Sequence, residues 1–341
     1  MNIEKIPVDT EARKAEWLAL RDQDVTASDI ATLLSVDAHP YRTPRRLWEV
    51  KAGHIRERIK DNRQLLRGRL MEPIVRKIIM DDHPTWQVIP GAHYYRDPEA
   101  RLGATPDAFI IRPDREGFGN CQIKTAGQWA FKKSWIVEDD EPDIDQDGDP
   151  VRTIVPPAWI MAQSILEGHL TGASWDCVAV VEMSDGLDLT IVDVPREPRV
   201  VENMYAKAAE FWASIATGVP PPFDWLRDEG LIGQLFAEER RPDLLDAMGD
   251  PAVEAALQDH ACGKAMIATG QDLKQRATSI LKNAIGDAPG LTFDRARVTW
   301  KTQVKPRTAL GPGSITRVLR VNDRRQDGAH SPQAHEAIDV F

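Results

Sequence analysis

The stretch GATPDAFIIRPDREGFGNCQIKTAG, residues 103–127, decides the fold. Asp107 precedes an apolar strand-like segment, and after a turn rich in glycine and charge a second strand carries Gln122-Ile123-Lys124. Side chains two residues apart on a strand point to one face, so Gln122 and Lys124 share a face while Ile123 turns into the core. A carboxylate would be expected at position 122, so the glutamine there calls for an explanation.

Chain length and net charge limit the classes of protein to which the sequence can belong. The chain has 341 residues, enough for one large core or two domains. Its net charge of −10 argues mildly against a nucleic-acid partner, but residues 138–149 hold eight acids and the remainder carries only −2. Basic stretches at residues 42–51 and 295–325 are compatible with a local basic groove.

Several classes of protein find no support in the motifs. The sequence has no long apolar run and no secretory signal, which predicts a cytoplasmic protein without a membrane segment. Its three cysteines form no CxxC pair, and HExxH, GxSxG and GxxxxGK motifs are absent. The run DIDQDGD, residues 143–149, matches half of a calcium-binding EF-hand loop, but Ile154 replaces the final glutamate, so a solvated loop is favoured.

The pattern of apolar residues alternates between helical and strand periods. Helices are expected in two pieces around residues 17–37, then at 43–53, 62–82 with a bend at Pro73, 126–136, 156–172 and 197–217. Strands are expected at residues 86–89, 93–96, 104–111, 120–124, 174–183 and 187–194. Residues 226–288 are expected to be helical, with a long helix at 251–284, and a hairpin is expected at 290–303. This order predicts an α/β fold, a mixed sheet with helices on both faces, and a helical C-terminal extension.

A set of polar residues fits metal-dependent phosphodiester hydrolysis: Glu72, Asp107, Gln122, Lys124 and Gln163. Such chemistry needs oxygen ligands for Mg²⁺, a water activated by the metal and a cation near the attacked phosphate. The carbonyl of Ile123 is available as a further ligand. The alternative is that Asp107 caps a turn and that Glu72 and Lys124 are surface charges.

The motifs GRLMEP, GATPDA, QIKT and WIMAQ, in this order, resemble the YqaJ-type viral recombinases, relatives of the phage lambda exonuclease in the PD-(D/E)XK nuclease superfamily. The N-terminal segment is also similar to the family's, through an arginine and a serine seven residues apart and a Y-x-T-x-x-x-LW pattern at Tyr41, Thr43, Leu47 and Trp48. The resemblance spans residues 15–222. It implies a nuclease domain at 1–225, with the acidic loop 138–152 as an insertion. Beyond this domain, the helical pattern predicts an extension at 226–325, and the polar composition predicts a flexible tail at 326–341.

The resemblance also implies roles for individual residues. Glu72, Asp107, residue 122 and the Ile123 carbonyl would bind Mg²⁺, or Mn²⁺ in its place, and Lys124 would orient the attacking water with support from Gln163. A DNA 5′-phosphate would be held by Arg21 and Ser28, with Thr105 in place of a family hydroxyl. The family has a further arginine shortly after the motif lysine. Here Lys132 and Lys133 stand in that neighbourhood and are its expected substitutes.

The implied function is a Mg²⁺-dependent exonuclease that acts on double-stranded DNA ends in the 5′-to-3′ direction and leaves 3′ single strands for phage-type recombination. The resemblance further implies a ring-shaped homo-oligomer, commonly a trimer, a single-strand annealing protein as partner, and a phage or bacterial source.

Two alternatives stay open at this stage. Gln122 could make the protein an end-binding protein that does not cut, since its amide is uncharged and favours Mg²⁺ less than a carboxylate does. The same core could also serve an endonuclease. The other expected metal ligands are present and the residues that flank Gln122 keep the motif, which favours a natural variant that is still active.

Overall fold

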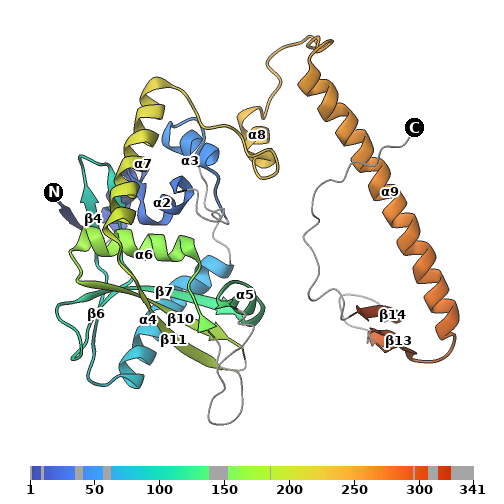
Figure 1. Cartoon of the computed structure of the whole chain (residues 1–341), viewed down its shortest axis with the longest axis horizontal. Coiled ribbons are helices and arrows are strands. Elements are labelled where there is room, and N and C mark those ends of the chain that lie inside the picture. Colours follow the sequence, from blue (N-terminus) through green and yellow to red (C-terminus); the bar gives the residue numbers. More distant parts are fainter. Residues whose placement is uncertain are drawn as a thin grey trace. The chain divides into compact units, whose positions relative to one another are not determined.

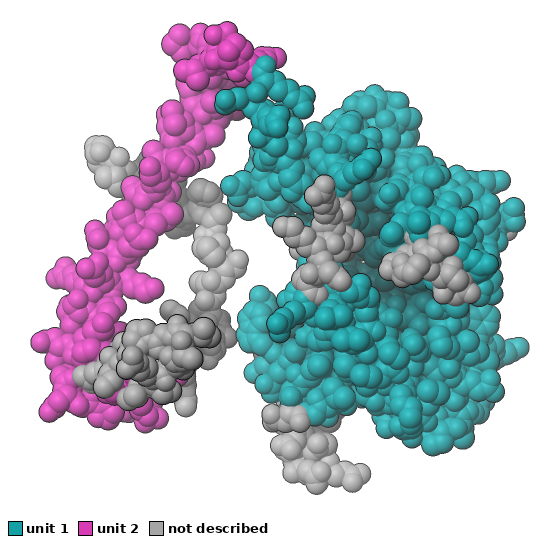
Figure 2. Space-filling model, turned by 180° about the vertical axis from the view of Figure 1, so that it is seen from behind, with its two compact units in different colours: residues 1–240 teal, residues 241–341 magenta. Residues whose placement is uncertain are grey.

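The computed structural model describes residues 2–8, 11–34, 41–56, 63–137, 153–184, 186–294, 296–305 and 314–323. The chain divides into two compact units, residues 1–240 and 241–341, which are described separately here (Figures 1 and 2). The first unit ends later than the boundary expected at residue 225. The acidic insertion at 138–152 and the tail at 326–341 lie outside the described residues.

A mixed five-stranded sheet forms the centre of the first unit. In spatial order its strands are β11 (Leu187–Val194), β10 (Trp175–Met183), β7 (Gly119–Gly127), β6 (Ala108–Ile111) and β3 (Gln87–Pro90). Strand β7 pairs parallel with β10 and antiparallel with β6, and both outer pairs are antiparallel. The two strands that the opening motif predicts are therefore direct neighbours.

A second sheet holds the N-terminal segment against the core. Its strands are β1 (Glu4–Pro7), β4 (His93–Asp97), β5 (Leu102–Ala104) and β2 (Val25–Thr26). Strands β8 (Ile136–Val137) and β9 (Thr153–Ile154) pair antiparallel on either side of the acidic segment. This second sheet connects the start of the chain to the segment that leads into Asp107.

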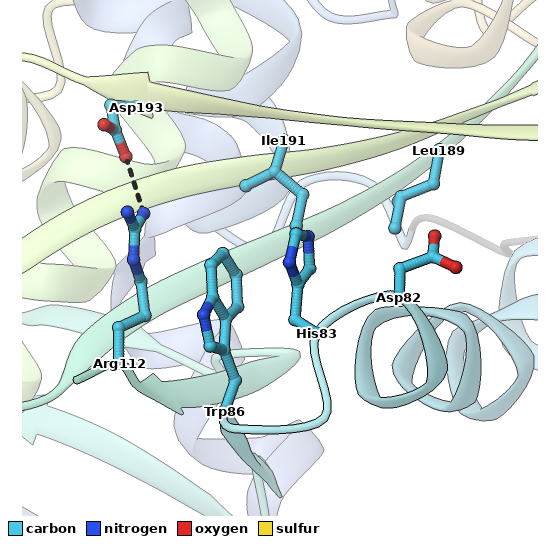
Figure 3. A pocket seen from close by; sticks show the side chains of 7 residues that line it. All are labelled: Asp82, His83, Trp86, Arg112, Leu189, Ile191 and Asp193. Atoms are coloured by element: carbon cyan, nitrogen blue, oxygen red, sulfur yellow. Dashed lines mark ion pairs between the residues drawn. The ribbon is translucent and has the colours of Figure 1, made fainter. Parts of the chain in front are cut away.

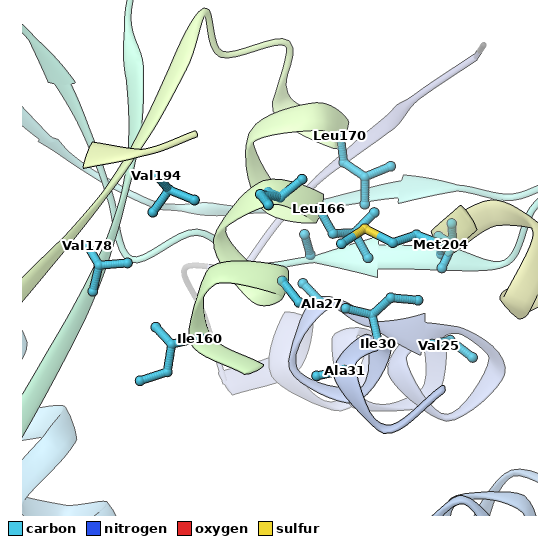
Figure 4. Close-up of a cluster of buried hydrophobic side chains, with 14 of the residues drawn as sticks. Val25, Ala27, Ile30, Ala31, Ile160, Leu166, Leu170, Val178, Val194 and Met204 are labelled. Atoms are coloured by element: carbon cyan, nitrogen blue, oxygen red, sulfur yellow. The ribbon is translucent and has the colours of Figure 1, made fainter. Parts of the chain in front are cut away.

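Helices cover both faces of the central sheet, as the sequence predicts. Because side chains alternate along a strand, Val178 and Val180 face helix α6 (Ala158–Thr171), whereas Cys177 and Ala179 face helix α4 (Arg63–Asp82). On the α6 side, helices α2 (Ala27–Leu33) and α7 (Pro198–Thr217) complete an apolar core, part of which Figure 4 shows. Helix α4 continues through Pro73.

The remaining helices of this unit differ from the expected ranges. They are α1 (Glu11–Gln23), α3 (Pro44–Lys51), α5 (Gln128–Ser134) and α8 (Glu229–Leu235). The first begins at residue 11 rather than about 17, and the helix expected at 126–136 covers only 128–134 because strands flank it. Residues 236–250 are not helical, although helix was expected throughout 226–288. Thr43 caps α3, and its hydroxyl donates to Asp228 at the start of α8, which ties α8 to the first unit. Gly172 ends α6 with a φ of 72°, a left-handed conformation that glycine adopts without strain.

The second unit contains helix α9 (Pro251–Ile285) and a three-stranded sheet. Strands β12 (Gly290–Thr292) and β13 (Ala296–Lys305) form the predicted hairpin. A further strand that was not predicted, β14 (Ser314–Asp323), pairs antiparallel with β13 along its whole length. None of the helices in the described part of the chain has the length and apolar character needed to span a membrane.

Candidate active site at the end of strands β6 and β7

Asp107 lies directly before β6, in a turn that a glycine holds in place. The backbone N–H of Gly91 donates to the Asp107 carbonyl at 3.1 Å. A Cβ atom at position 91 would lie only 1.8 Å from the carbonyl oxygen of Pro106, so only glycine fits there. This glycine, which was not predicted as a site residue, fixes the backbone from which the Asp107 carboxylate projects.

Strand β7 continues past the end of its pairing with β6, and this leaves an open backbone edge beside Asp107. Pairing with β6 stops at Cys121, and the N–H of Ile123 instead donates to Asp107 Oδ2 at 2.8 Å. The N–H and carbonyl of one strand residue point to the same edge, so the Ile123 carbonyl also lies on this open edge. The structure thus leaves the Ile123 carbonyl available for the ligand role that the family resemblance implies.

A continuous chain of hydrogen bonds joins four predicted site residues. Lys124 Nζ donates to Gln163 Oε1 at 3.2 Å, and Gln163 Nε2 donates to Gln122 Oε1 at 3.0 Å. Gln122 Nε2 donates in turn to Asp107 Oδ2. Gln122 is only 2% exposed, so its amide makes hydrogen bonds with these side chains in place of water. The prediction that Gln122 and Lys124 share the face opposite Ile123 is confirmed, since Ile123 packs into the core on the α4 side.

Glu167, which the sequence analysis missed, extends this chain. It lies one helical turn after Gln163 on α6, is 1% exposed, and accepts from Gln163 Nε2 at 2.9 Å. A signal for it exists in the sequence: it is a lone carboxylate in the largely apolar segment AWIMAQSILEGHL, and buried glutamates are rare unless they are paired.

Close packing of α6 against the sheet positions Gln163 and Glu167 above β7. A Cβ atom on Gly168 would lie 1.9 Å from Asp176 Oδ1, so the close approach of α6 to β10 requires glycine at this position. Asn120 on β7 donates to the Ser164 carbonyl at 3.0 Å and to Asp176 at 3.2 Å. These contacts hold the helix and the strand in a fixed register.

The carboxyl groups near this site all have raised pKa values. Burial, followed by the charge of Asp107, raises the pKa of Glu72 from 4.5 to about 7. Burial also raises the pKa of Asp107, although Lys124 and the Ile123 N–H oppose the shift. For Glu167, burial and then Asp107 raise the pKa well above its usual range. Carboxylates that repel one another in a buried site favour the binding of a cation.

The donor set fits a hard divalent cation. Glu72 and Asp107 offer carboxylates and Ile123 a carbonyl, and such oxygen donors suit Mg²⁺. The Gln122 amide presents its nitrogen to Asp107 and its oxygen to Gln163, so the amide would have to turn for its oxygen to become a ligand. Within the described residues, no three His, Cys, Asp or Glu side chains gather as a metal site. The proposed set therefore depends on its amide and backbone oxygens as well as on its two carboxylates.

A second charged cluster contains the residues implied for a 5′-phosphate. Its centre is Asp29, to which Arg42 pairs directly and Lys51 pairs at 3.7 Å. Burial raises the pKa of Asp29, but the charges of Arg42 and Lys51 outweigh it, so the pKa is lowered overall. Arg21 adds a third positive charge, and Lys51 Nζ donates to the Arg21 carbonyl at 2.6 Å.

The hydroxyl of Ser28 also lies at this cluster, 2.9 Å from the hydroxyl of Thr26. Thr26 in turn donates to Asp29 at 2.7 Å. Three cations surround the Asp29 carboxylate, with Asp22 as a second acid near Lys51, and two hydroxyls lie beside them. Cations and hydroxyls are both groups that can bind a phosphate.

Trp17 links the two clusters, and the sequence analysis missed this role. Its Nε1 donates to the Thr105 hydroxyl at 3.2 Å, two residues before Asp107. The guanidinium of Arg21 lies over the Trp17 ring, 4.9 Å from its centre. A single side chain thus connects the residue implied for the phosphate with the turn that carries Asp107.

Other residues of the family pattern have mainly structural roles. Leu47 and Trp48 are buried in the core on the α6 side, while Tyr41 is exposed and contacts Trp159 edge to face. Lys132 and Lys133 lie exposed on α5, and Lys133 lies 5.1 Å above the Trp129 ring. Their contact with a phosphate stays a prediction.

A cavity of about 380 Å³ lies elsewhere on the first unit, lined by Asp82, His83, Trp86, Arg112, Leu189, Ile191 and Asp193 (Figure 3). His83 stacks on Trp86, and Arg112 lies over Trp86 and pairs with Asp193 at 3.7 Å. None of the predicted site residues lines this cavity. Two of its charged groups, Arg112 and Asp193, are paired with each other.

These elements define the class of fold. Helix α4, the antiparallel strands β3, β6 and β7, helix α6 and the parallel strand β10 form a PD-(D/E)XK-type core, with Asp107 and the Gln-Ile-Lys run on adjacent strands. Residues 16–150 match the family model described as YqaJ-like viral recombinase domain. The resemblance inferred from the motifs is therefore confirmed for this part of the chain, which includes all the predicted site residues except Gln163.

Solved structures are similar at low identity. An alkaline exonuclease, LHK-Exo, from Laribacter hongkongensis is 18% identical with a TM-score of 0.44, over 64% of this chain and 98% of that chain. A SOX–DNA complex is 11% identical with a TM-score of 0.38, over 66% of this chain and 74% of that chain. No curated protein matches the chain.

Proposed function

We propose that the protein is a Mg²⁺-dependent deoxyribonuclease that degrades double-stranded DNA from a 5′ end and leaves a 3′ single strand. The observation that carries this proposal is the hydrogen-bonded chain from Lys124 through Gln163 and Gln122 to Asp107, beside the carboxylate of Glu72. The match of residues 16–150 to a viral recombinase domain supports the choice of DNA as substrate.

Each residue has a defined task in this proposal. Glu72, Asp107, Gln122 and the Ile123 carbonyl would hold the divalent cation. When bound, the cation lowers the pKa of a water and neutralises charge on the phosphate. Lys124 orients the attacking water, and Gln163 fixes the Lys124 ammonium group by accepting its hydrogen bond.

The second cluster would set the position of the DNA end. Arg21 and Ser28 contact the 5′-phosphate, and the cations around Asp29 balance the charge of that phosphate. The link through Trp17 and Thr105 then sets the distance between the held end and Asp107. Lys132 and Lys133 contribute further phosphate contacts in this proposal.

A ring-shaped homo-oligomer, a single-strand annealing partner and a cytoplasmic location complete the proposal. Enclosure of DNA by a ring would let a protein of net charge −10 stay on its substrate, because it replaces part of the electrostatic attraction to the backbone. The oligomer is tested by measuring the mass in solution, with and without DNA.

The function is tested by incubating the protein with a 5′-phosphorylated linear duplex and with a covalently closed circle, in Mg²⁺, in Mn²⁺ and in EDTA. We expect metal-dependent loss of the linear duplex only, with product analysis showing 3′ single strands. Cleavage of the closed circle would indicate an endonuclease instead. Binding to ends without any cleavage would indicate an end-binding protein.

A further inference from the structure

Glu167 has an unusual environment for a carboxylate. It is buried on α6, and the only hydrogen bond that its carboxylate receives from a described side chain comes from Gln163, at Oε1. Its second oxygen, Oε2, is buried and has no hydrogen-bond partner among the described residues. An unpartnered carboxylate oxygen in a buried position costs free energy, so it needs a functional or structural reason.

The hydrogen-bonded chain has one consistent direction, and Glu167 helps to set it. Lys124 can only donate, so Gln163 must present its oxygen to Lys124 and its nitrogen to the other side. The nitrogen then donates to both Gln122 and Glu167. Gln122 thereby receives a hydrogen bond at its oxygen and turns its nitrogen to Asp107. A glutamate at position 122 would instead face the Asp107 carboxylate as a second acceptor.

We propose that Glu167, on helix α6, supplies the carboxylate that a glutamate at position 122 of strand β7 would otherwise supply. It acts as a positioning residue, because it holds the amide of Gln163 and, through it, that of Gln122. Burial keeps Glu167 protonated while no cation is bound. A divalent cation at Asp107 and Glu72 would displace this proton, and the carboxylate would then add negative charge to the site. This inference rests on the proposed function, since it concerns the same site.

The test compares variants that carry a carboxylate at position 167, at position 122 or at neither position. Mn²⁺ binding is measured in the absence of DNA, from the electron paramagnetic resonance signal of free Mn²⁺. Glu167→Gln keeps the shape and the acceptor for Gln163 but removes the charge. We expect it to weaken Mn²⁺ binding by roughly 10- to 100-fold, the range for residues that support metal ligands. The double variant Gln122→Glu/Glu167→Gln, which returns the carboxylate to the strand, should regain most of the affinity.

The control is Glu49→Gln. Glu49 is an equally buried glutamate on α3 that pairs with Arg45 and His54, and its replacement should leave Mn²⁺ binding unchanged. Thermal unfolding of every variant checks that the fold is retained. Unchanged Mn²⁺ binding by Glu167→Gln, or a double variant as weak as Glu167→Gln, would overturn the inference. If the unaltered protein neither binds Mn²⁺ nor cleaves DNA, the proposed function itself fails.

An independent observation concerns the second unit, where one face of the β12–β13–β14 sheet is basic. Arg297 and Lys301 lie four residues apart on β13 and so share a face, about 13 Å apart at 3.3 Å per residue. Arg320 on β14 pairs with Thr299, midway between them, and therefore lies on the same face. All three are exposed, and none pairs with an acid among the described side chains.

The opposite face of this sheet packs inward. Val298 is buried, and Lys282 of α9 lies 5.4 Å from the centre of the Trp300 ring. The basic face is thus the outer one, and its described residues include no acid although the chain as a whole carries −10. We infer that this face binds the phosphate backbone of DNA, without contact to base edges.

This second inference is tested by DNA binding in EDTA at several salt concentrations, which separates it from cleavage. The triple variant Arg297→Ala/Lys301→Ala/Arg320→Ala should bind a blunt duplex more weakly and reduce the slope of log affinity against log salt by about 2 to 3. The control Lys264→Ala/Lys274→Ala/Arg276→Ala removes the same charge from exposed positions of α9. Equal losses in both triple variants, or no loss in the first, would contradict the inference.

Discussion

Two aspartates of the first unit show how neighbouring charges define a site. Asp29 has its pKa lowered, because Arg42, Lys51 and Arg21 outweigh the effect of burial. Asp107 has its pKa raised, because burial outweighs Lys124 and its hydrogen bonds. The Asp29 cluster therefore gathers cations around one carboxylate, whereas the Asp107 cluster gathers buried carboxyl groups beside Lys124. One suits a phosphate and the other a metal ion, and Trp17 connects them.

The largest effect is expected from Lys124→Ala, which should reduce cleavage by roughly 10²- to 10⁴-fold, the usual contribution of a group that positions or transfers a proton. DNA binding in EDTA should be retained, since the Asp29 cluster is unchanged. The measurement is the initial rate of loss of a linear duplex. Lys77→Ala serves as the control, because Lys77 pairs with Asp81 on the exposed side of α4. Equal rates for the Lys124 variant and the unaltered protein would remove Lys124 from the site.

The variant Glu72→Gln tests the carboxyl groups around Asp107, which are proposed to bind the cation. Protons compete with a cation for Glu72, whose pKa is about 7, so Mn²⁺ affinity should rise as the pH increases from about 6 to 8. The variant should bind Mn²⁺ roughly 10- to 100-fold more weakly and show a flatter pH dependence.

The same pKa shift makes a prediction for stability without metal. The folded protein holds the proton of Glu72 up to a higher pH than the unfolded chain does, so this group lowers the free energy of unfolding as the pH rises from 4.5 to about 7. Urea unfolding at several pH values measures this trend. A steeper fall for Glu72→Gln than for the unaltered protein would contradict it.

The variant Arg21→Ala tests the cations around Asp29, which are proposed to bind the 5′-phosphate. Loss of a charged hydrogen bond to the DNA end should reduce the preference for a 5′-phosphate over a 5′-hydroxyl about 10-fold or more. Rates on the two substrates give this ratio directly. Arg115→Ala, which removes an arginine paired with Asp193, should leave the ratio unchanged. An intact preference in the Arg21 variant would place the phosphate elsewhere.

The smallest effect is expected at the link between the clusters. Trp17→Phe removes the hydrogen bond to Thr105 and should lower the free energy of unfolding by about 0.5–1.5 kcal/mol. Trp225→Phe, at an exposed position, should change it by less than about 0.5 kcal/mol. Urea unfolding compares the two variants. A larger loss for Trp225→Phe would show that Trp17 does not join the clusters.

The fold of the first unit could be predicted from local patterns. Apolar periodicity predicted α4, β7 and β10, and the end expected for a helix at residue 172 matches Gly172 at the end of α6. Strand β14 was missed because its only strong evidence is its pairing with β13, which no local pattern reveals.

The site was predicted less completely for the same reason. Asp107, Gln122 and Lys124 follow from one short stretch, and the structure brings them together with Gln163. The roles of Trp17, Gly91 and Glu167 depend on contacts with residues far away or on the packing of a helix against the sheet. A lone glutamate in an apolar helix was the one visible sign of Glu167.

The central claim is that Gln122 belongs to a working site. It is tested most directly by comparing the rate of Mg²⁺-dependent degradation of a 5′-phosphorylated duplex by the unaltered protein and by Gln122→Glu. We predict that the unaltered protein degrades the duplex, because the amide oxygen of Gln122 and the charge of Glu167 together serve the cation. Degradation by Gln122→Glu alone would contradict the claim and show a nuclease fold that binds DNA ends without cutting them.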